Sequence, residues 1–120
     1  MPTSHGEVDV DRSQLLKGTT ALLILGVLKD GELYGYEIGQ RIRERSGALI
    51  DPGEGWLYPA LHRLERQGAL ASYWLKGDLG PRRRYYRITE AGLAAFNAQA
   101  AEWEQFAQSV RLVTAGAANA

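Results

Sequence analysis

The chain has 120 residues and no cysteine, and its 14 Lys or Arg balance 14 Asp or Glu, so its formal net charge is zero. This length fits one small domain with a helical arm. The absence of thiols excludes disulfides and thiolate metal sites, and the zero net charge excludes a wholly basic, histone-like binder. Two histidines, His5 and His62, are too few for a histidine-based metal cluster, so we expect no metal and no cofactor.

The N-terminal residues 1–13 are polar and acidic, and we expect them to form a flexible arm. They lack the basic start and apolar stretch of a signal peptide. The longest uncharged apolar run, residues 18–28, is far too short to span a bilayer. These features predict a cytoplasmic protein without a membrane partner.

Apolar spacing predicts three helices, over residues 14–29, 34–46 and about 54–67. The first is apolar around most of its circumference, so it should be buried on more than one side. The second has an inner stripe of Tyr34, Ile38 and Ile42, and Glu37 with Arg41 forms an outward pair. The third buries one face and closes at Gly68, and its buried residues should be Leu57, Ala60, Leu61 and Leu64.

A β-hairpin should follow, with strands over residues 70–76 and 82–88 and a Gly/Pro-rich tip between them. Thr89 is a good N-cap for a final helix over residues 90–113, before a flexible tail, residues 114–120. Apolar residues of this helix recur at steps of four and three, the spacing of a seam for another helix. We therefore expect this helix to form a surface for a second copy of the chain. The candidate dimerisation residues are Leu16, Leu23, Phe96, Ala100, Trp103, Phe106, Ala107 and Val110.

Three helices followed by a two-stranded hairpin are the plan of a winged helix-turn-helix domain, here residues 14–88, with residues 89–113 as a C-terminal dimerisation helix. The fold class is mainly α with a small β-hairpin. In such domains the free face of the third helix enters the major groove. Residues 54–88 carry seven Lys or Arg against three Asp or Glu, so the zero total conceals a segment with a surplus of four positive charges. Phosphate neutralisation needs such charge.

The candidate DNA-binding residues lie on the second helix, the free face of the third helix and the hairpin. Alternation along the strand sends Arg82 and Arg84 to one face and Arg83 to the other. Arg63 contacts DNA or pairs with Glu65 or Glu54, and Trp56 lies on a sugar or packs sideways. The full candidate set is Tyr36, Gly55, Trp56, Tyr58, His62, Arg63, Arg66, Lys76, Arg82, Arg83 and Arg84.

Four ordered segments resemble the PadR family of bacterial transcriptional regulators: LLKGT at 15–19, LYGYEI at 33–38, LYPALHRLE at 57–65 and GPRRRYYRITEAG at 80–92. The resemblance extends from about Leu15 to Trp103. It implies a dimeric winged-helix repressor whose C-terminal helix dimerises, and the single terminal helix resembles the family's short subgroup. Some members respond to small phenolic acids or hydrophobic cationic compounds. Trp103 is accordingly a candidate for stacking a small planar aromatic or hydrophobic ligand, or it simply fills the dimer interface; Ala107 stands where a cationic ligand would need a carboxylate.

These features predict a homodimeric, sequence-specific regulator of transcription that binds an inverted-repeat operator in double-stranded DNA. We do not expect an enzyme, because no nucleophile–base set and no phosphate-cradling glycine loop is present. The alternative is a winged-helix module that binds another protein through its third helix. The two differ in salt dependence, because phosphate binding weakens steeply as salt rises.

Overall fold

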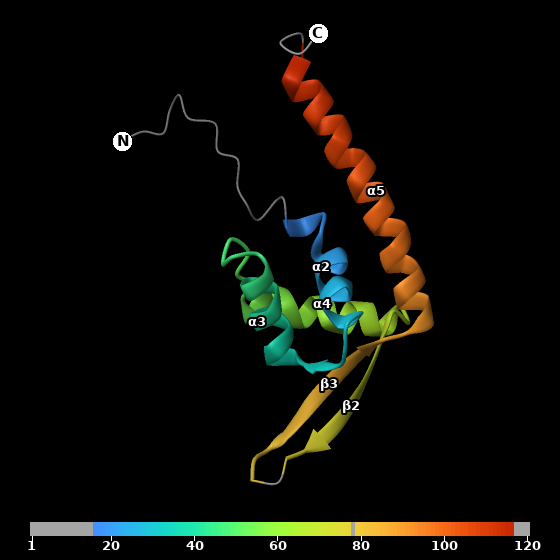
Figure 1. The fold of residues 1–120 in the computed structure, drawn as a ribbon. Helices are drawn as coiled ribbons and strands as arrows, with labels where there is room; N and C mark the ends of the chain where they lie inside the picture. Colours follow the sequence, from blue (N-terminus) through green and yellow to red (C-terminus); the bar gives the residue numbers. More distant parts are fainter. Residues whose placement is uncertain (1–15, 78, 117–120) are drawn as a thin grey trace, which may run out of the picture.

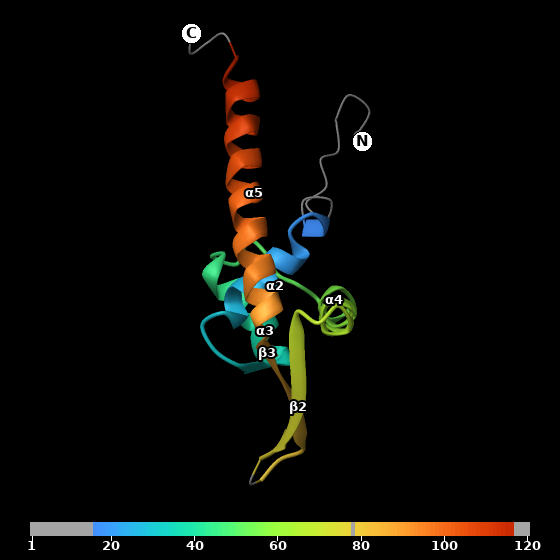
Figure 2. The same ribbon diagram turned by 90° about the vertical axis from the view of Figure 1, so that its right-hand side faces the viewer.

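The computed structural model of the chain describes residues 16–77 and 79–116. The predicted N-terminal arm and the last four residues of the predicted tail lie outside this part. In chain order the elements are α2 (Thr20–Leu28), β1 (Leu33–Tyr34), α3 (Gly35–Arg45), α4 (Glu54–Arg66), β2 (Leu70–Lys76), β3 (Arg82–Ile88) and α5 (Glu90–Ala115). The helices α2, α3 and α4 form a body, and α5 and the hairpin of β2 and β3 extend from it in opposite directions (Figures 1 and 2). This arrangement confirms the mainly helical winged helix-turn-helix fold.

The first predicted helix is shorter than expected. Residues 16–17 are helical, but a turn at residues 18–19 separates them from α2, so one helix over residues 14–29 was wrong in the described part. The Leu16 carbonyl accepts hydrogen bonds from the Thr19 N–H at 3.0 Å and from the Thr20 hydroxyl at 2.8 Å. Threonine side chains that bond in this way to a carbonyl one turn earlier in the chain compete with the helical ladder.

The sheet has three strands and not two. The two-residue strand β1 pairs antiparallel with β3, giving the order β1-β3-β2 with Leu33 opposite Tyr86 and Tyr34 opposite Tyr85. Tyr34 was predicted to lie in the second helix, but its backbone is extended and it precedes α3 as the N-cap. A two-residue strand leaves no periodic signal in the sequence. The predicted hairpin strands, in contrast, are confirmed at both ends.

Glu37 caps the start of α3. The Tyr34 N–H donates to the Glu37 carboxylate at 3.1 Å, which satisfies a backbone donor that the helix leaves unpaired. The outward pair of Glu37 with Arg41 was therefore wrong. Arg41 lies instead 3.8 Å from Glu44, one turn further along the helix.

The core lies between the helices and one face of the sheet. All four predicted inner residues of α4 are buried, and Tyr86 of β3 is only 1% exposed. Because residues of a strand alternate between faces, Tyr86 is the point at which the sheet enters the helical core. The larger buried residues are Ile24, Leu25, Val27, Leu28, Leu33, Ile38, Ile42, Leu57, Leu61, Leu64, Leu70 and Tyr86.

The end of α4, the start of β2, the end of β3 and the start of α5 meet at Thr89. Its hydroxyl donates to the Gly68 carbonyl at 2.6 Å and accepts from the Gly92 N–H at 3.0 Å, which confirms Thr89 as the N-cap of α5. The Thr89 N–H donates to the Ala69 carbonyl at 3.0 Å. Gly68 has a φ of +82°, the left-handed conformation expected of a glycine after a helix end. We call Gly68, Ala69, Thr89 and Gly92 the junction.

At the junction, Gly92 leaves no room for a side chain. A Cβ atom there would lie 2.1 Å from the Ala69 carbonyl oxygen, a backbone atom that cannot rotate away. Gly55, in the first turn of α4, has nothing within 4 Å of its Cβ position. The two glycines therefore differ in packing although both begin a helix.

We predict that Gly92→Ala lowers the free energy of unfolding by about 1–3 kcal/mol or more, because overpacking forces backbone shifts. The matched control Gly55→Ala should leave stability unchanged or raise it by up to about 1 kcal/mol, because alanine is the better helix former. Thermal and urea unfolding of both variants measure the difference. Equal stability of the two would contradict the close packing at Gly92.

None of the described helices combines the length and apolar character that crossing a membrane requires.

Candidate nucleic-acid interface

The helix α4 presents a polar face away from the core. Gly55, His62, Arg63 and Arg66 are exposed on it, opposite the buried Leu57, Ala60, Leu61 and Leu64. Gly55 lies in the first turn, where unpaired N–H groups and the helix dipole favour an anion. The free surface predicted for the third helix is therefore present from its first turn to its last.

Two of the candidate residues on α4 are only partly free. Trp56 is half-buried and packs against the core, which agrees with the sideways alternative and not with a fully groove-facing ring. Tyr58 packs over the start of α3. Its ring lies so close to Gly35 that a Cβ atom added there would be 2.8 Å from the ring. Burial, with a smaller contribution from the Glu54 carboxylate, raises the pKa of Tyr58 above its ordinary value. Its hydroxyl therefore remains a hydrogen-bond donor at neutral pH.

The arginines of the wing, which is the hairpin of β2 and β3, alternate between faces as predicted. The guanidinium carbons of Arg82 and Arg84 lie 4.9 and 5.8 Å from the centroid of the Trp74 ring. Arg83 lies instead over Tyr34 at 4.6 Å. Contacts at these distances are typical of cation–π interactions, in which the face of a ring attracts the guanidinium charge.

Arg84 is engaged inside the protein. Its guanidinium donates to the Glu65 carboxylate at 2.8 Å and to the Ser72 hydroxyl at 2.9 Å, and Ser72 donates to Glu65 at 2.6 Å. This triad joins the last turn of α4 to both strands of the wing. It also means that Glu65 pairs with Arg84 and not with Arg63, for which it was one predicted partner.

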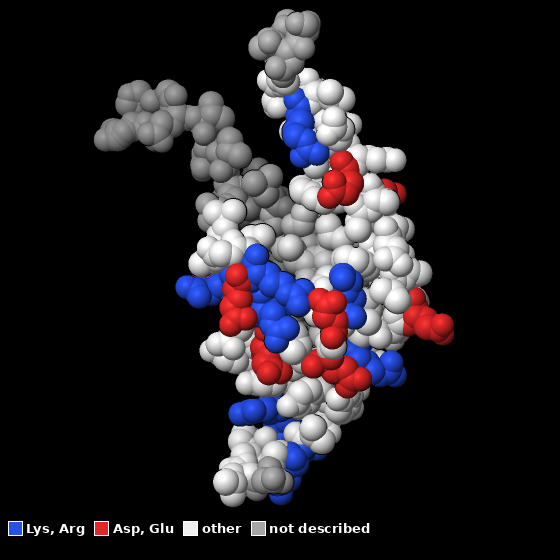
Figure 3. Space-filling view, in the orientation of Figure 1, with Lys and Arg blue, Asp and Glu red and all other residues white. Residues whose placement is uncertain are grey.

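The arginines of α3 are paired, whereas most cations of α4 and the wing have no carboxylate within 4 Å among the described residues. Arg41, Arg43 and Arg45 lie within 4 Å of Glu44, Asp51 and Asp30 respectively. Within the described part of the chain, Arg84 is the only cation of α4, β2 or β3 with a carboxylate at that distance. In the space-filling view, positive and negative side chains are interleaved over the helical body, whereas the described charged side chains visible on the wing below it are positive (Figure 3).

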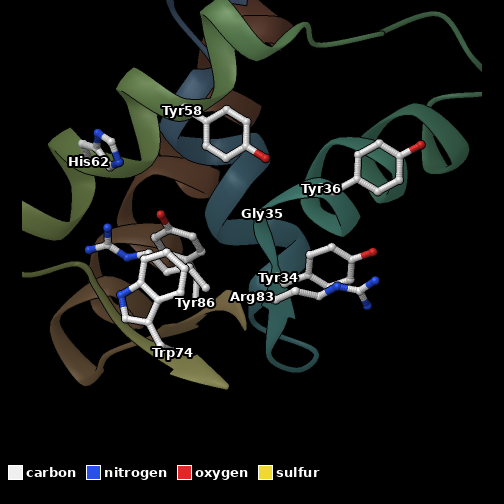
Figure 4. A pocket seen from close by; sticks show the side chains of 9 residues that line it. Tyr34, Gly35, Tyr36, Tyr58, His62, Trp74, Arg83 and Tyr86 are labelled. Carbon is white, nitrogen blue, oxygen red and sulfur yellow. The ribbon is translucent and has the colours of Figure 1, made fainter. Parts of the chain in front are cut away.

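A cleft of about 360 Å³ lies between α4, the start of α3 and the wing (Figure 4). Tyr36, 59% exposed, stands at its edge and accepts a hydrogen bond from the Gln40 amide at 3.1 Å. The cleft brings together Tyr36, Tyr58, His62, Arg83 and Arg84 of the candidate set. The candidates outside its lining are Gly55, Trp56, Arg63, Arg66, Lys76 and Arg82. The residues that line it are Tyr34, Gly35, Tyr36, Tyr58, His62, Trp74, Arg83, Arg84 and Tyr86.

The contributions of Trp74, Tyr34 and Glu65 were not predicted from the sequence. Trp74 stands opposite Arg84 in the register of the hairpin, so the pairing of residues 70–76 with 82–88 places them on one face. That signal was present once the hairpin was predicted. Glu65 lies 19 residues before Arg84, and no local spacing identifies such a pair.

The second half of α5 forms an uncovered apolar surface. Trp103, Phe106 and Val110 are 43, 62 and 43% exposed, and the Trp103 and Phe106 rings lie 6.3 Å apart. Ala100 and Ala107 on the same stripe are half-buried. Contiguous apolar surface of this kind is typical of an interface.

Phe96 was a candidate dimerisation residue of this stripe, but it packs within its own chain. Its ring lies against Gly26 of α2, 3.3 Å from the position of a Cβ there, and the Lys29 ammonium lies 5.7 Å from the ring centroid. Leu23 also packs against the core, and Leu16 is half-buried. The first turns of α5 are therefore anchored to α2, and the seam open to a partner begins further along the helix.

Comparisons with known proteins agree with this architecture. The sequence model of the transcriptional regulator PadR-like family matches residues 24–98. A transcriptional regulator of Mycobacterium tuberculosis is 38% identical over 94 residues, which cover 78% of this chain and 84% of that protein. An uncharacterised protein of Lysinibacillus sphaericus is 31% identical over 105 residues, covering 88% of this chain and 96% of its own length.

Solved structures show the same similarity. A transcriptional regulator from Clostridium thermocellum matches with a TM-score of 0.75 at 36% identity, over 82% of this chain and 95% of that one. A PadR family transcriptional regulator from Eggerthella lenta matches with a TM-score of 0.73 at 33% identity, over 82% and 84% of the two chains. The family consists of regulators and not of enzymes, which confirms that expectation. The chain belongs to the PadR-like family of transcriptional regulators, whose members bind DNA.

Proposed function

We propose that the protein is a homodimeric repressor that binds an inverted-repeat operator in double-stranded DNA through α4 and the wing. The observation that carries the proposal is the difference in ion pairing between neighbouring elements. Each arginine of α3 has a carboxylate partner, whereas Arg82 and Arg83 of the wing have none within the described residues. Unpaired guanidinium groups are available to neutralise phosphates and to release counterions.

The exposed face of α4 supplies the sequence-reading part of the proposal. Gly55 allows close approach of a phosphate to the first turn, and Tyr58 and His62 can donate to phosphates or base edges. Arg63 and Arg66 continue the face toward the end of the helix, and Lys76 and Arg82 stand together in the register of the wing. Tyr36 at the start of α3 is a further phosphate contact.

The uncovered part of α5 supports the dimeric part of the proposal. In a twofold dimer built on Trp103, Phe106 and Val110, two copies of α4 would read successive major grooves. The half-site centres should then lie about 10 base pairs apart or at a multiple of this spacing. A regulator of this kind acts on chromosomal DNA, and we propose a cytoplasmic location for it.

An effector site is the finer part of the proposal. In the dimer, two Trp103 rings would face each other with the small Ala100 and Ala107 beside them, leaving space for a small planar aromatic or hydrophobic molecule. Because α5 begins at Thr89, directly after the wing, a ligand that changes the spacing of the terminal helices would change the spacing of the two α4 helices. Release of the operator by such a ligand would correspond to a coupling of about 1–3 kcal/mol.

Replacing Arg82 and Arg83 together by Ala should weaken binding to the operator and to random duplex alike. Each phosphate contact contributes about 0.9 to the slope of log K against log salt, so the slope should fall by up to about two units. Fluorescence anisotropy at a series of salt concentrations measures it. Arg43→Ala with Arg45→Ala is the matched control, because it removes the same charge from a paired surface. Equal slopes in the two double variants would contradict the wing assignment. A binding affinity that does not change with salt would favour the alternative, in which α4 binds another protein.

Selection of bound sequences from a random duplex pool should return an inverted repeat. Repeating the selection with His62→Ala should change the preferred bases, because His62 lies in the middle of the exposed face of α4. Arg66→Ala, the control at the end of the helix, should lower affinity while the preferred bases stay the same. An unchanged base preference in His62→Ala would remove His62 from base recognition.

Light scattering at micromolar concentration should report about twice the 13.2 kDa chain mass. Phe106→Glu should shift the protein toward the monomer, because a buried carboxylate without a partner is costly. Gln105→Glu, which adds the same charge on the opposite side of α5, should remain dimeric. A monomeric parent protein, or a dimeric Phe106→Glu variant, would contradict the interface.

A further inference from the structure

The cleft between α4 and the wing is unusually aromatic for a surface that meets DNA. Five tyrosine and tryptophan rings line it: Tyr58 comes from α4, Tyr34 from β1, Tyr36 from α3, and Trp74 and Tyr86 from the wing (Figure 4). Tyr86 is buried, whereas Trp74 is 53% exposed. The cleft therefore has a buried aromatic floor and an accessible indole at its side.

The charge of the lining is positive. Arg83 and Arg84 are lining residues, and no carboxylate of the described chain is one. The two arginines have different roles, because Arg84 is bound to Glu65 and Ser72, whereas Arg83 rests on Tyr34 and has no acidic partner among the residues that the structure describes. Arg83 is therefore the cation available to a ligand, and the Tyr58 hydroxyl and the His62 imidazole supply further polar groups at the same cleft.

An intact DNA duplex uses only part of this chemistry. Its phosphates suit Arg83, but its bases are stacked on one another and offer edges, not faces, to a protein. Aromatic side chains bind nucleic acid most effectively when they stack on the faces of unpaired bases, beside cations that hold the backbone. The rings and the cation of the cleft together match a base and a phosphate joined in one ligand.

We propose that the cleft between α4 and the wing binds one unpaired nucleotide, with its base on the aromatic lining beside Trp74 and its phosphate at Arg83. A free nucleotide and a nucleotide of single-stranded DNA share this chemistry. The cleft volume of about 360 Å³ lies within the range of about 300–1,000 Å³ found for small-molecule sites.

Binding in the cleft has a consequence for the proposed regulator. Tyr36, Tyr58, His62 and Arg83 line the cleft and also belong to the proposed duplex-binding surface. A nucleotide held there would occupy the phosphate-binding groups of that surface, so it and the operator would exclude each other. This site is separate from the apolar surface around Trp103 on α5, and it does not depend on dimerisation.

The test uses the indole of Trp74 as the reporter. The chain has three tryptophans, so Trp56→Phe with Trp103→Phe leaves Trp74 alone in the full-length protein. We would titrate this variant with adenosine 5′-monophosphate, adenosine, inorganic phosphate and the single-stranded tetranucleotide (dA)4. Saturable quenching is expected from the ligands that combine base and phosphate, at concentrations at which adenosine and inorganic phosphate have little effect. Calorimetric titration of the parent protein with the same ligands provides the measurement if the double variant does not fold.

Arg83→Gln in the same background should weaken binding of the phosphorylated ligands by about tenfold or more, because hydrogen bonds to a charged group are the strong ones. The matched control is Arg87→Gln, an exposed arginine on the same strand and the same face that does not line the cleft. Its affinity should be unchanged.

The ligands identify the source of the nucleotide. Saturation by adenosine 5′-monophosphate alone assigns the cleft to a free nucleotide, and saturation by (dA)4 alone assigns it to single-stranded DNA. The proposal is overturned if neither ligand saturates, or if quenching is the same in Arg83→Gln as in Arg87→Gln, since the base would then only stack on an exposed indole. None of these measurements involves duplex DNA, so their failure leaves the proposed operator binding to be judged by its own experiments.

Discussion

The junction around Thr89 is the contact on which the rest of the molecule depends. One side chain there binds the carbonyl of Gly68 at the end of α4 and the N–H of Gly92 at the start of α5, while the Thr89 backbone pairs with Ala69 at the start of β2. The element proposed to read DNA, the wing and the element proposed to dimerise therefore share one hydrogen-bonded point. The absence of a side chain at Gly92 is what allows this approach.

Most of the fold could be predicted from local patterns. Alternation and the Gly/Pro tip gave both strands of the hairpin, and apolar spacing gave α3 and α4 to within one residue at each end. The errors came where tertiary pairing or a side chain overrode the pattern. Leu33 and Tyr34 form a strand because β3 offers them a partner, and a threonine hydroxyl that bonds to the Leu16 carbonyl accompanies the break before α2. Neither effect has a periodic signature.

The site was predictable as a surface but not as a set of partners. The positive surplus of residues 54–88 and the free face of α4 were apparent from the sequence, as was the alternation of the wing arginines. Which of those arginines is paired within the protein and which is available to a ligand depends on Glu65. This residue is distant from Arg84 in the sequence, and the fold brings the two together. Packing also decided where Trp56 and Phe96 lie, since both rings are drawn into the interior by neighbours distant in sequence or on another element.

The position of the junction at the carboxyl end of α4 makes this helix a lever. Its 13 residues span about 20 Å, and Gly55 lies at the far end. A rotation of about 5° at the junction would move that end by nearly 2 Å. An N–H···O hydrogen bond requires a donor–acceptor distance of about 2.7–3.2 Å, so a displacement of this size would break it. A small change in the angle of α5 would thus displace the first turn of α4 most and Arg66 least. A rearrangement of the dimer would therefore change the position of the amino end of α4 more than that of its carboxyl end.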